Sequence, residues 1–244
     1  MRQTPRQQHH RRIRSSLMSL SSAVITFPGS NCDRDAQTYL EALTSQDTHK
    51  VWHKDVSLPK VDLLIIPGGF SFGDYLRSGA MASKSPIIND VLKHADRGGY
   101  IIGICNGFQI LTEIGLLDGA LNRNINLKFL AKNCFIKKNH DNHFNKKILP
   151  DQCLSIPVAH NEGSYYNSEE GLKSLEDNQQ ISFLYCNENG NTTDQSNLNG
   201  SLNHIAGITN KKKNVLGLMP HPERAFQDFH TSQDGQLILE SLLG

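Results

Sequence analysis

The sequence predicts an α/β fold, in which a mostly parallel sheet carries helices on both faces and short added strands in its second half. Two observations predict it. Apolar runs of strand length alternate with amphipathic helical segments through the first half of the chain, and only short strand-like runs follow later. Regular alternation of strand and helix is typical of a parallel sheet. With 244 residues and no repeat or dividing linker, the chain suits one enzyme domain.

The first half contains the regular part of this pattern. We expect strands at residues 23–27, 50–52, 63–66 and 100–104, and helices at 33–43, at 85–96 and directly after 105. Ser30 or Asn31 is expected to open the first helix, and Ser85 with Pro86 the second. The predicted strands end near Phe27, Ile66 and Ile104, at the edge where α/β sheets bind ligands.

The second half of the chain has a different pattern from the first. Three short strands, at 154–158, 181–185 and 204–208, are expected to extend or flank the sheet. The polar, aromatic-free segment 187–200 is expected to be a mobile loop. The run 137–147 is expected to be a solvated loop, because His140 and His143 have no evident companions for a metal site.

Composition narrows the class of protein. The net charge of +1 gives no sign of nucleic-acid binding, and no run is long enough to span a membrane. Five cysteines without a Cys-x-x-Cys pair indicate free thiols in a reducing compartment. Four of the five cysteines are expected to have no part in catalysis. Residues 1–18 hold five arginines and no acid, which fits an over-extended start or a disordered tail, with a transit peptide as the alternative.

The most informative stretch is Gly103 to Gln109, where a cysteine lies between two glycines at a strand-to-helix turn. Such a turn strains its central residue, and the glycines give room for the two backbones. Cys105 would then project outward at the positive end of a helix dipole, which favours a thiolate. A packing turn with a buried, inert cysteine is the alternative if the string stands alone.

A base for this nucleophile is present near the other end of the chain. Pro222 disfavours helical backbone at His221, and in extended backbone residues two apart point to the same side. Glu223 would accept a hydrogen bond from one ring nitrogen of His221 and leave the other free to take a proton from Cys105. Each string follows an apolar strand, and together they predict nucleophilic catalysis.

The glycine pair Gly68-Gly69 supplies a third element, because it directly follows the buried strand at 63–66. Glycine allows backbone N–H groups to approach a ligand closely. Together with the N–H of Asn106, an N–H of Gly68 or Gly69 is expected to form an oxyanion hole. An ordinary strand-ending turn is the alternative for this string by itself.

These strings carry a family resemblance. The chain resembles class I (triad-type) glutamine amidotransferases, and within them the family of glutaminase subunits of phosphoribosylformylglycinamidine synthase. The likeness runs from about residue 23 to 243, and its strings lie at residues 27–35, 67–80, 105–111 and 217–224. The Cys-x-Gly-x-Gln and His-Pro-Glu strings belong to the whole class, whereas the strings at 27–35 and 67–80 point to this one member.

The resemblance implies a flavodoxin-like glutamine amidotransferase type 1 domain over residues 19–244 and a concrete mechanism. Cys105 would attack the side-chain amide of glutamine, His221 would move protons and Glu223 would orient it. Ammonia would leave first, and water would then hydrolyse a glutamyl thioester. Gln109 matches the position that contacts the amino-acid end of the substrate. Phe70 and Ser71 match the positions that line the glutamine pocket in this class.

The resemblance also implies partners and cofactors. Ammonia would pass to a separate synthetase subunit, which uses ATP and magnesium to convert formylglycinamide ribonucleotide to the amidine in purine (IMP) biosynthesis. A small third subunit usually completes this short type of complex. The chain itself lacks a Gly-x-x-x-x-Gly-Lys phosphate loop, which fits nucleotide binding elsewhere. We therefore expect no cofactor and no metal in this subunit, no nucleic acid or membrane partner, and a cytoplasmic location.

Three alternatives compete with this interpretation. A cysteine amidase or deglycase-like enzyme on a similar sheet would not require Gln109 or a late His-Pro-Glu. An inactive scaffold for a synthetase would be expected to have a broken triad. Another amidotransferase of the class is disfavoured only by the family-specific strings. Asn161, Ser164 and His204 depart from the family pattern, and we expect them to bear on subunit contacts or pocket shape.

Overall fold

The structure is a computed structural model that describes residues 20–243. Five parallel strands form one half of a nine-stranded sheet, in the order β2-β1-β3-β4-β11. They are β2 His49–Trp52, β1 Ser22–Thr26, β3 Leu63–Ile66, β4 Tyr100–Ile104 and β11 Val215–Leu218. Strands β3, β4 and β11 are fully or almost fully buried, as apolar strands covered on both faces must be. The predicted α/β, flavodoxin-like fold class is confirmed.

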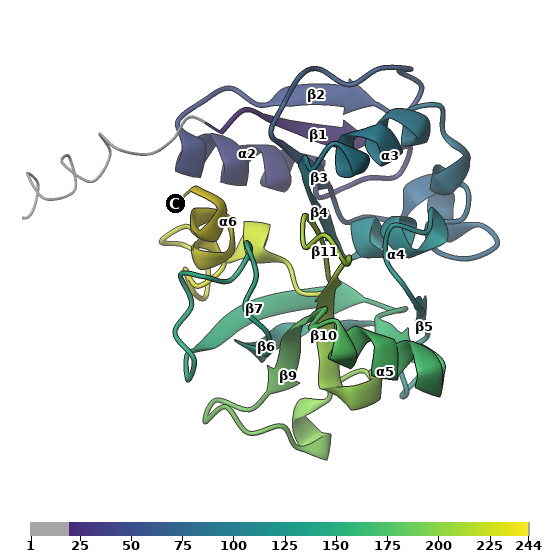
Figure 1. The fold of residues 1–244 in the computed structure, drawn as a ribbon. Helices are drawn as coiled ribbons and strands as arrows, with labels where there is room; N and C mark the ends of the chain where they lie inside the picture. The colour runs from purple at the N-terminus through teal and green to yellow at the C-terminus, as the bar shows by residue number, and fades with distance from the viewer. Residues whose placement is uncertain (1–19, 244) are drawn as a thin grey trace, which may run out of the picture.

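Helices cover both faces of this parallel half. Helix α2 (Asp33–Thr44) packs against α6 (Gln236–Leu243) on one face, while α3 (Ile88–Asp96) and α4 (Asn106–Glu113) lie on the other (Figure 1). Two expected helix caps are wrong. Cys32 takes the cap position of α2 without a side-chain hydrogen bond, and Ser85 lies upstream of α3, where its hydroxyl pairs with His53.

The other half of the sheet is antiparallel and follows in the order β10-β9-β6-β7. Its strands are β10 Ile205–Thr209, β9 Ile181–Cys186, β6 Leu130–Lys138 and β7 Cys153–His160. The three predicted short strands are therefore correct, and β6 is an additional one. Strand β7 passes beside the carboxyl ends of β4 and β11 (Figure 1). There the His221 N–H donates to the carbonyl oxygen of Pro157 on β7 at 2.8 Å.

Smaller elements complete the fold. Strands β5 (Ala120–Asn122) and β8 (Ser164–Tyr166) pair as a separate two-stranded sheet, and α5 spans Glu169–Asp177. The predicted tail over residues 1–18 lies outside the described residues. Within residues 20–243, no helix has both the length and the apolar character needed to cross a bilayer.

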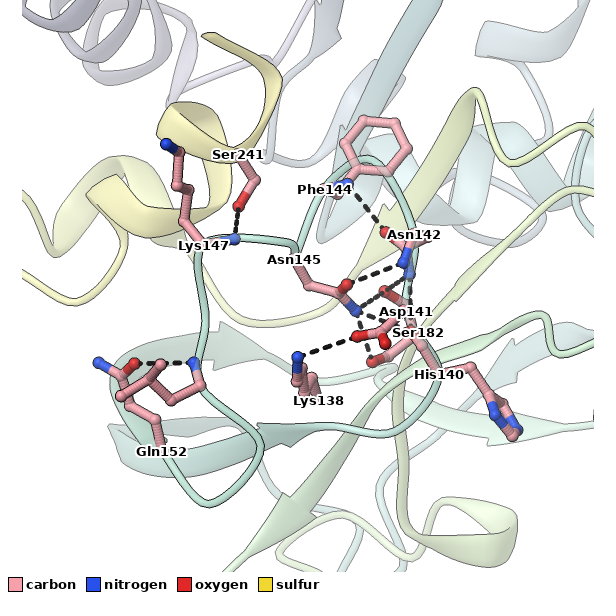
Figure 2. Close-up of polar contacts among 11 residues, drawn as sticks. Lys138, His140, Asp141, Asn142, Phe144, Asn145, Lys147, Gln152, Ser182 and Ser241 are labelled. Carbon is pink, nitrogen blue, oxygen red and sulfur yellow. Dashed lines mark hydrogen bonds and ion pairs between the residues drawn. The ribbon is translucent and has the colours of Figure 1, made fainter. Parts of the chain in front are cut away.

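The β6–β7 loop was expected to be solvated, and this prediction is wrong at its centre. Asn145 is fully buried and Asn142 nearly so. Asn142 donates to the Ser182 hydroxyl at 2.8 Å, and Asn145 to the carbonyl oxygen of His140 at 2.9 Å (Figure 2). Side-chain amides thus replace the backbone pairing that a loop lacks, which explains how this polar run folds into the core.

The 187–200 segment is also more structured than expected. A 3-10 turn at Asp194–Ser196 is closed by a capping box from Thr193. Asn199 is fully buried and donates to the carbonyl oxygen of Gly163 at 2.7 Å. Asn199 also donates to the hydroxyl of Tyr185 on β9 at 3.2 Å, which attaches the segment to the antiparallel half of the sheet.

Candidate active site

Cys105 occupies the predicted turn between β4 and α4. Its backbone has φ 51° and ψ −106°, a conformation that costs a non-glycine residue about 1–3 kcal/mol. The N–H of Cys105 donates to the carbonyl oxygen of Leu218 at 2.8 Å, which ties the turn to β11. The strain therefore persists because the neighbouring strand holds the turn in place.

The glycines on either side of Cys105 are required by packing. A Cβ at Gly107 would overlap the carbonyl oxygen of Ile66 at the end of β3. A Cβ at Gly103 would lie 2.7 Å from the carbonyl oxygen of Gly107. The first turn of α4 thus packs directly on the sheet, as the sequence predicts, and this contact presents Cys105 at the carboxyl edge.

His221 and Glu223 follow β11, beside Cys105. The Nδ1 of His221 lies 2.6 Å from Oε1 of Glu223, and both side chains are almost completely buried. The backbone that places this pair is not extended, as was expected, because residues Pro222–Arg224 form a 3-10 turn. A Cβ placed on Gly68 would lie 2.7 Å from Cε1 of His221 and 3.4 Å from Cβ of Cys105. The absence of a side chain at Gly68 therefore allows the imidazole to approach the cysteine.

Electrostatics favour a protonated imidazole in this pair. Burial alone would lower the pKa of His221, but the Glu223 carboxylate and the neighbouring Cys105 and Cys32 thiols raise it well above its ordinary value. Within residues 20–243 the Nε2 of His221 is buried without a hydrogen-bond partner. An imidazolium held by a carboxylate stabilises negative charge on a neighbouring sulfur. The arrangement provides a nucleophile, a proton carrier and an orienting acid.

Cys32 was expected to be a bystander, yet it lies beside the triad. Its Sγ accepts a hydrogen bond from Nη2 of Arg224 at 3.1 Å, and Arg224 also pairs with Asp35 of α2 at 2.9 Å. Ligand atoms of Cys32, His221 and Glu223 lie within 4.8 Å of one another. Burial raises the pKa of Cys32, while His221 and Arg224 oppose that rise. A second sulfur therefore flanks the imidazole.

A cavity of about 320 Å³ opens at Cys105. Small-molecule sites of this size are common in enzymes. Its lining comes from both halves of the sheet and from the loops between them: Gly69, Phe70, Asp74, Ser78, Cys105, Gln109, Arg123, Ala159, His160, Asn161 and Glu162. The carbonyl oxygen of Ala159 lies 3.6 Å from the Sγ of Cys105. The nucleophile is only 5% exposed, but it faces this cavity.

The three residues predicted to bind glutamine have different surroundings. Phe70 and Gln109 line the cavity. Gln109 is already engaged, because its Oε1 accepts from Asn106 at 2.8 Å and its Nε2 donates to the carbonyl oxygen of Glu162 at 2.6 Å. Ser71 is buried outside the lining, and its N–H donates to Oδ1 of Asn106 at 3.2 Å. Gln109 thus fixes the wall of the cavity through Glu162.

The predicted oxyanion donors lie at the correct edge of the sheet. Asn106 is the first residue of α4, so its N–H has no partner within the helix. Gly69 lines the cavity with φ 147°, and a Cβ there would lie 2.7 Å from the carbonyl oxygen of Gly29. Gly68 turns its carbonyl oxygen to the N–H of Cys32 at 3.2 Å. Of the two glycines only Gly69 lines the cavity, so Gly69 and Asn106 are the candidate donors nearest to it.

Several residues of the site had no predicted role. Asp74, Ser78, Arg123 and Glu162 line the cavity from three separate loops. Their only signal in the sequence was that Asp74 and Ser78 lie inside the string at 67–80 and that Glu162 stands next to Asn161, one of the departures from the family pattern. Of the three departures from the family pattern, Asn161 lines the cavity, whereas Ser164 pairs within the β5–β8 sheet and His204 lies in the 3-10 turn at Leu202–His204.

Comparison with known proteins agrees with this geometry. The family model described as "CobB/CobQ-like glutamine amidotransferase domain" matches residues 20–237. The solved structure of a glutamine amidotransferase from Thermotoga maritima is 15% identical over 85% of this chain and 78% of its own, with a TM-score of 0.56. At this identity the likeness shows a common fold. The fold and the site define the class, a glutamine amidotransferase.

More similar proteins narrow the class to one family. The PurQ subunit of phosphoribosylformylglycinamidine synthase from Pelagibacter ubique is 50% identical over 92% of this chain and 98% of its own length. That from Sulfurimonas denitrificans is 50% identical over 90% and 97%. A chain of the PurLQS structure from Thermotoga maritima is 39% identical over 93% and 98%, with a TM-score of 0.81. The chain belongs to the PurQ family, as its strings predicted.

Proposed function

We propose that Cys105, His221 and Glu223 hydrolyse glutamine to glutamate and ammonia, for use by the synthetase subunit of phosphoribosylformylglycinamidine synthase. The observation that carries this proposal is the buried His221–Glu223 pair beside a strained cysteine that opens on a cavity. The PurQ relatives supply the reaction to which the ammonia goes. That reaction is the amidation of formylglycinamide ribonucleotide.

In the first half-reaction, the Sγ of Cys105 attacks the side-chain carbonyl carbon of glutamine. The carbonyl electron pair moves to oxygen, where the N–H groups of Gly69 and Asn106 stabilise the negative charge. Collapse of this intermediate breaks the C–N bond, and the imidazolium of His221 gives its proton to the leaving nitrogen. Ammonia leaves, and a glutamyl thioester remains on Cys105.

In the second half-reaction, water replaces the sulfur. Neutral His221 takes a proton from water as its oxygen bonds to the thioester carbon. The C–S bond then breaks and returns its electron pair to Cys105, which restores thiolate and imidazolium. Throughout both steps Glu223 accepts the hydrogen bond from Nδ1 of His221 and fixes which nitrogen faces the substrate.

An apolar rim beside the cavity is the proposed docking surface for the synthetase subunit. Six large apolar side chains are exposed on two loops, and we define the rim by them: Phe70, Tyr75, Leu76, Ile125, Leu127 and Phe129. The rings of Phe70 and Phe129 lie 6.4 Å apart, so the two loops meet. The same loops supply the cavity residues Asp74 and Arg123. A partner seated there would cover the exposed apolar surface and receive ammonia close to where it forms.

Backbone strain supports a binding role for the rim. Leu76 and Leu127 have φ of 70° and 56°, in a region that leucine rarely adopts. Such strain concentrates at functional sites, where the surrounding structure maintains it. The strained loops hold apolar side chains outward, and burial against a partner would offset that cost.

The remaining parts of the proposal concern cofactors, a third subunit and location. Hydrolysis is proposed to use no metal in this chain, since Glu223 is bound to His221 and the Arg224 guanidinium would repel a cation at Cys32. ATP and magnesium are assigned to the synthetase subunit, and a small third subunit is proposed to complete the complex. All five cysteines are free, and we place the complex in the cytoplasm on that basis.

Replacement of the nucleophile tests the proposal. In the assembled complex, Cys105→Ala should abolish glutamine-dependent amidine formation, because no other group in the mechanism forms the thioester. Ammonia-dependent amidine formation should persist, which controls for the synthetase. Unchanged use of glutamine by the variant would refute the assignment. We also expect the isolated chain to hydrolyse glutamine slowly, and rapid turnover without the synthetase would contradict that coupling.

A further inference from the structure

The side chain of Asn106 has no role in either half-reaction, although it is enclosed beside the nucleophile. Asn106 directly follows Cys105 and is 1% exposed. A buried primary amide needs partners for its acceptor oxygen and its two donor hydrogens, because an unpaired polar group in the interior costs stability. The partners of Asn106 therefore show what its side chain holds together.

Asn106 is the centre of a directed chain of hydrogen bonds. Its Oδ1 accepts from the N–H of Ser71 at 3.2 Å, and its Nδ2 donates to Oε1 of Gln109 at 2.8 Å. The Nε2 of Gln109 then donates to the carbonyl oxygen of Glu162 at 2.6 Å. We call this chain the amide relay. Because it starts at a backbone N–H, which only donates, and ends at a backbone carbonyl, which only accepts, the orientation of both side-chain amides is determined.

The loop at the start of the relay needs external support. Phe72 and Asp74 have φ of 54° and 53°, a region that is unfavourable for side chains other than glycine. On one side the loop is tied to the β1 end of the sheet, where the N–H of Phe72 donates to the carbonyl oxygen of Pro28 at 2.6 Å. On the other side it is tied to Asn106, through the N–H of Ser71 and, at 3.4 Å, through Oδ1 of Asp74.

This loop also carries a proposed oxyanion donor. Gly69 lies two residues before Ser71 and lines the cavity at Cys105. The amide relay thus connects the donor at Gly69 to the residue next to the nucleophile. An oxyanion donor acts over about 2.7–3.1 Å, and a misplacement of about 1 Å costs roughly 100-fold in rate. A contact that holds the loop to Asn106 is therefore a contact that controls the reaction rate.

We propose that the side chain of Asn106 is a positioning residue, which holds the N–H of Gly69 at the correct place relative to Cys105. This inference rests on the proposed function and concerns the same site. The backbone N–H of Asn106 is a separate contribution, because it is retained whatever side chain stands there. An aspartate would still accept from Ser71, but its ionised carboxylate has no hydrogen to donate to Gln109.

Asn106→Asp tests the proposal through a pH profile. At pH 8 the carboxylate faces the acceptor oxygen of Gln109, so kcat for glutamine-dependent amidine formation by the assembled complex should be about 10- to 100-fold below wild type. Burial raises the pKa of a carboxyl group. Its protonated form donates to Gln109 and restores the relay, so the deficit relative to wild type should shrink by about fivefold between pH 8 and pH 6.

The comparison with wild type removes the titration of the surrounding groups. Those that face this position from the neighbouring elements are present in both proteins: Asp74, Cys105, Glu162, His221 and Glu223. The quantity to follow is therefore the ratio of the two kcat values at each pH. Asn106→Leu removes both relay contacts at every pH, and its deficit should not recover.

Two controls separate this inference from the proposed function. Asn178→Asp changes an exposed amide at the end of α5, which donates to the carbonyl oxygen of Ser174, and should leave kcat and its pH dependence unchanged. Ammonia-dependent amidine formation should be the same in every variant, because the synthetase is unaltered.

The outcomes are distinguishable. A wild-type complex that cannot use glutamine would overturn the proposed function itself. Wild-type kcat in both Asn106 variants would overturn only the role of the Asn106 side chain, and so would a deficit in Asn106→Asp that stays constant from pH 8 to pH 6. If Asn106→Leu does not assemble, the pH profile of Asn106→Asp decides by itself.

Discussion

The two halves of the sheet contribute different things to one cavity. Cys105 and His221 follow neighbouring parallel strands, each within a few residues of the strand end. Glu162 follows β7 of the antiparallel half, and Asp74 and Arg123 come from loops. We call the part of the site formed by Cys105, His221 and Glu223 the chemical end, and it is buried and held by strands. We call the part formed by Asp74, Arg123 and Glu162 the charged end, and it is partly exposed. Reactivity and substrate recognition are therefore supported by separate parts of this fold. Substitutions at one end should change kcat, and substitutions at the other end should change KM.

Glu223→Gln should produce the largest effect at the chemical end. A glutamine amide presents either an N–H or an oxygen to Nδ1 and no longer fixes the histidine tautomer. We expect kcat for glutamine-dependent amidine formation to fall by about 10²- to 10⁴-fold. KM should change little, because Glu223 is not part of the cavity lining. A loss confined to KM would contradict the separation of the two ends.

Gly107→Ala should reduce stability through the contact of α4 with β3. The added methyl overlaps the carbonyl oxygen of Ile66, which cannot move without disturbing the sheet. We expect a loss of about 2–4 kcal/mol in the free energy of unfolding, measured by denaturant titration. The comparison is Gly98→Ala, where the new Cβ has no neighbour within 4 Å, so that only the φ of 87° costs stability, by about 1–2 kcal/mol. Equal losses in both variants would show that the close approach at Gly107 is unimportant.

The charged end should respond to pH through Asp74. With a pKa of about 6 in the free protein, Asp74 is ionised at pH 7 and becomes protonated as the pH falls through 6. Because Asp74 lines the cavity at Cys105, we expect loss of its charge to weaken glutamine binding, with KM rising about tenfold between pH 7 and pH 5. The facing groups are Glu162, Ser78 and, beyond them, Arg123. In Asp74→Asn this rise should disappear, and its persistence would mean that another group controls binding.

Cys32→Ser should have the smallest effect. Serine keeps a hydrogen-bonding group near Arg224 but is smaller and less polarisable than the sulfur that contacts it. We expect kcat to fall by about two- to tenfold, since Cys32 flanks His221 without lining the cavity. Abolished activity would instead indicate that Cys32 takes part in the chemistry.

The sequence predicted the chemical end better than the charged end for a physical reason. Cys105 and His221 each stand in a short string beside an apolar strand, so local patterns place them at one sheet edge. Asp74, Arg123 and Glu162 come from three loops far apart in the sequence, and Glu162 reaches the cavity through β7, which passes beside that edge. Strand β6, which pairs with β7, was not predicted at all. The hydrogen bond from Gln109 to the carbonyl oxygen of Glu162 could not be predicted from the sequence either, because the two residues lie 53 positions apart. Contacts between distant loops leave no local pattern.

Cys105 and Cys32 both flank His221, so the identity of the nucleophile is the central claim. Acid quenching of the assembled complex during turnover of radiolabelled glutamine, followed by peptide mapping, would locate the thioester directly. The account predicts label on the peptide that contains Cys105 and none on the peptide that contains Cys32. Label on Cys32, or rapid turnover with no covalent intermediate under conditions that preserve thioesters, would contradict it.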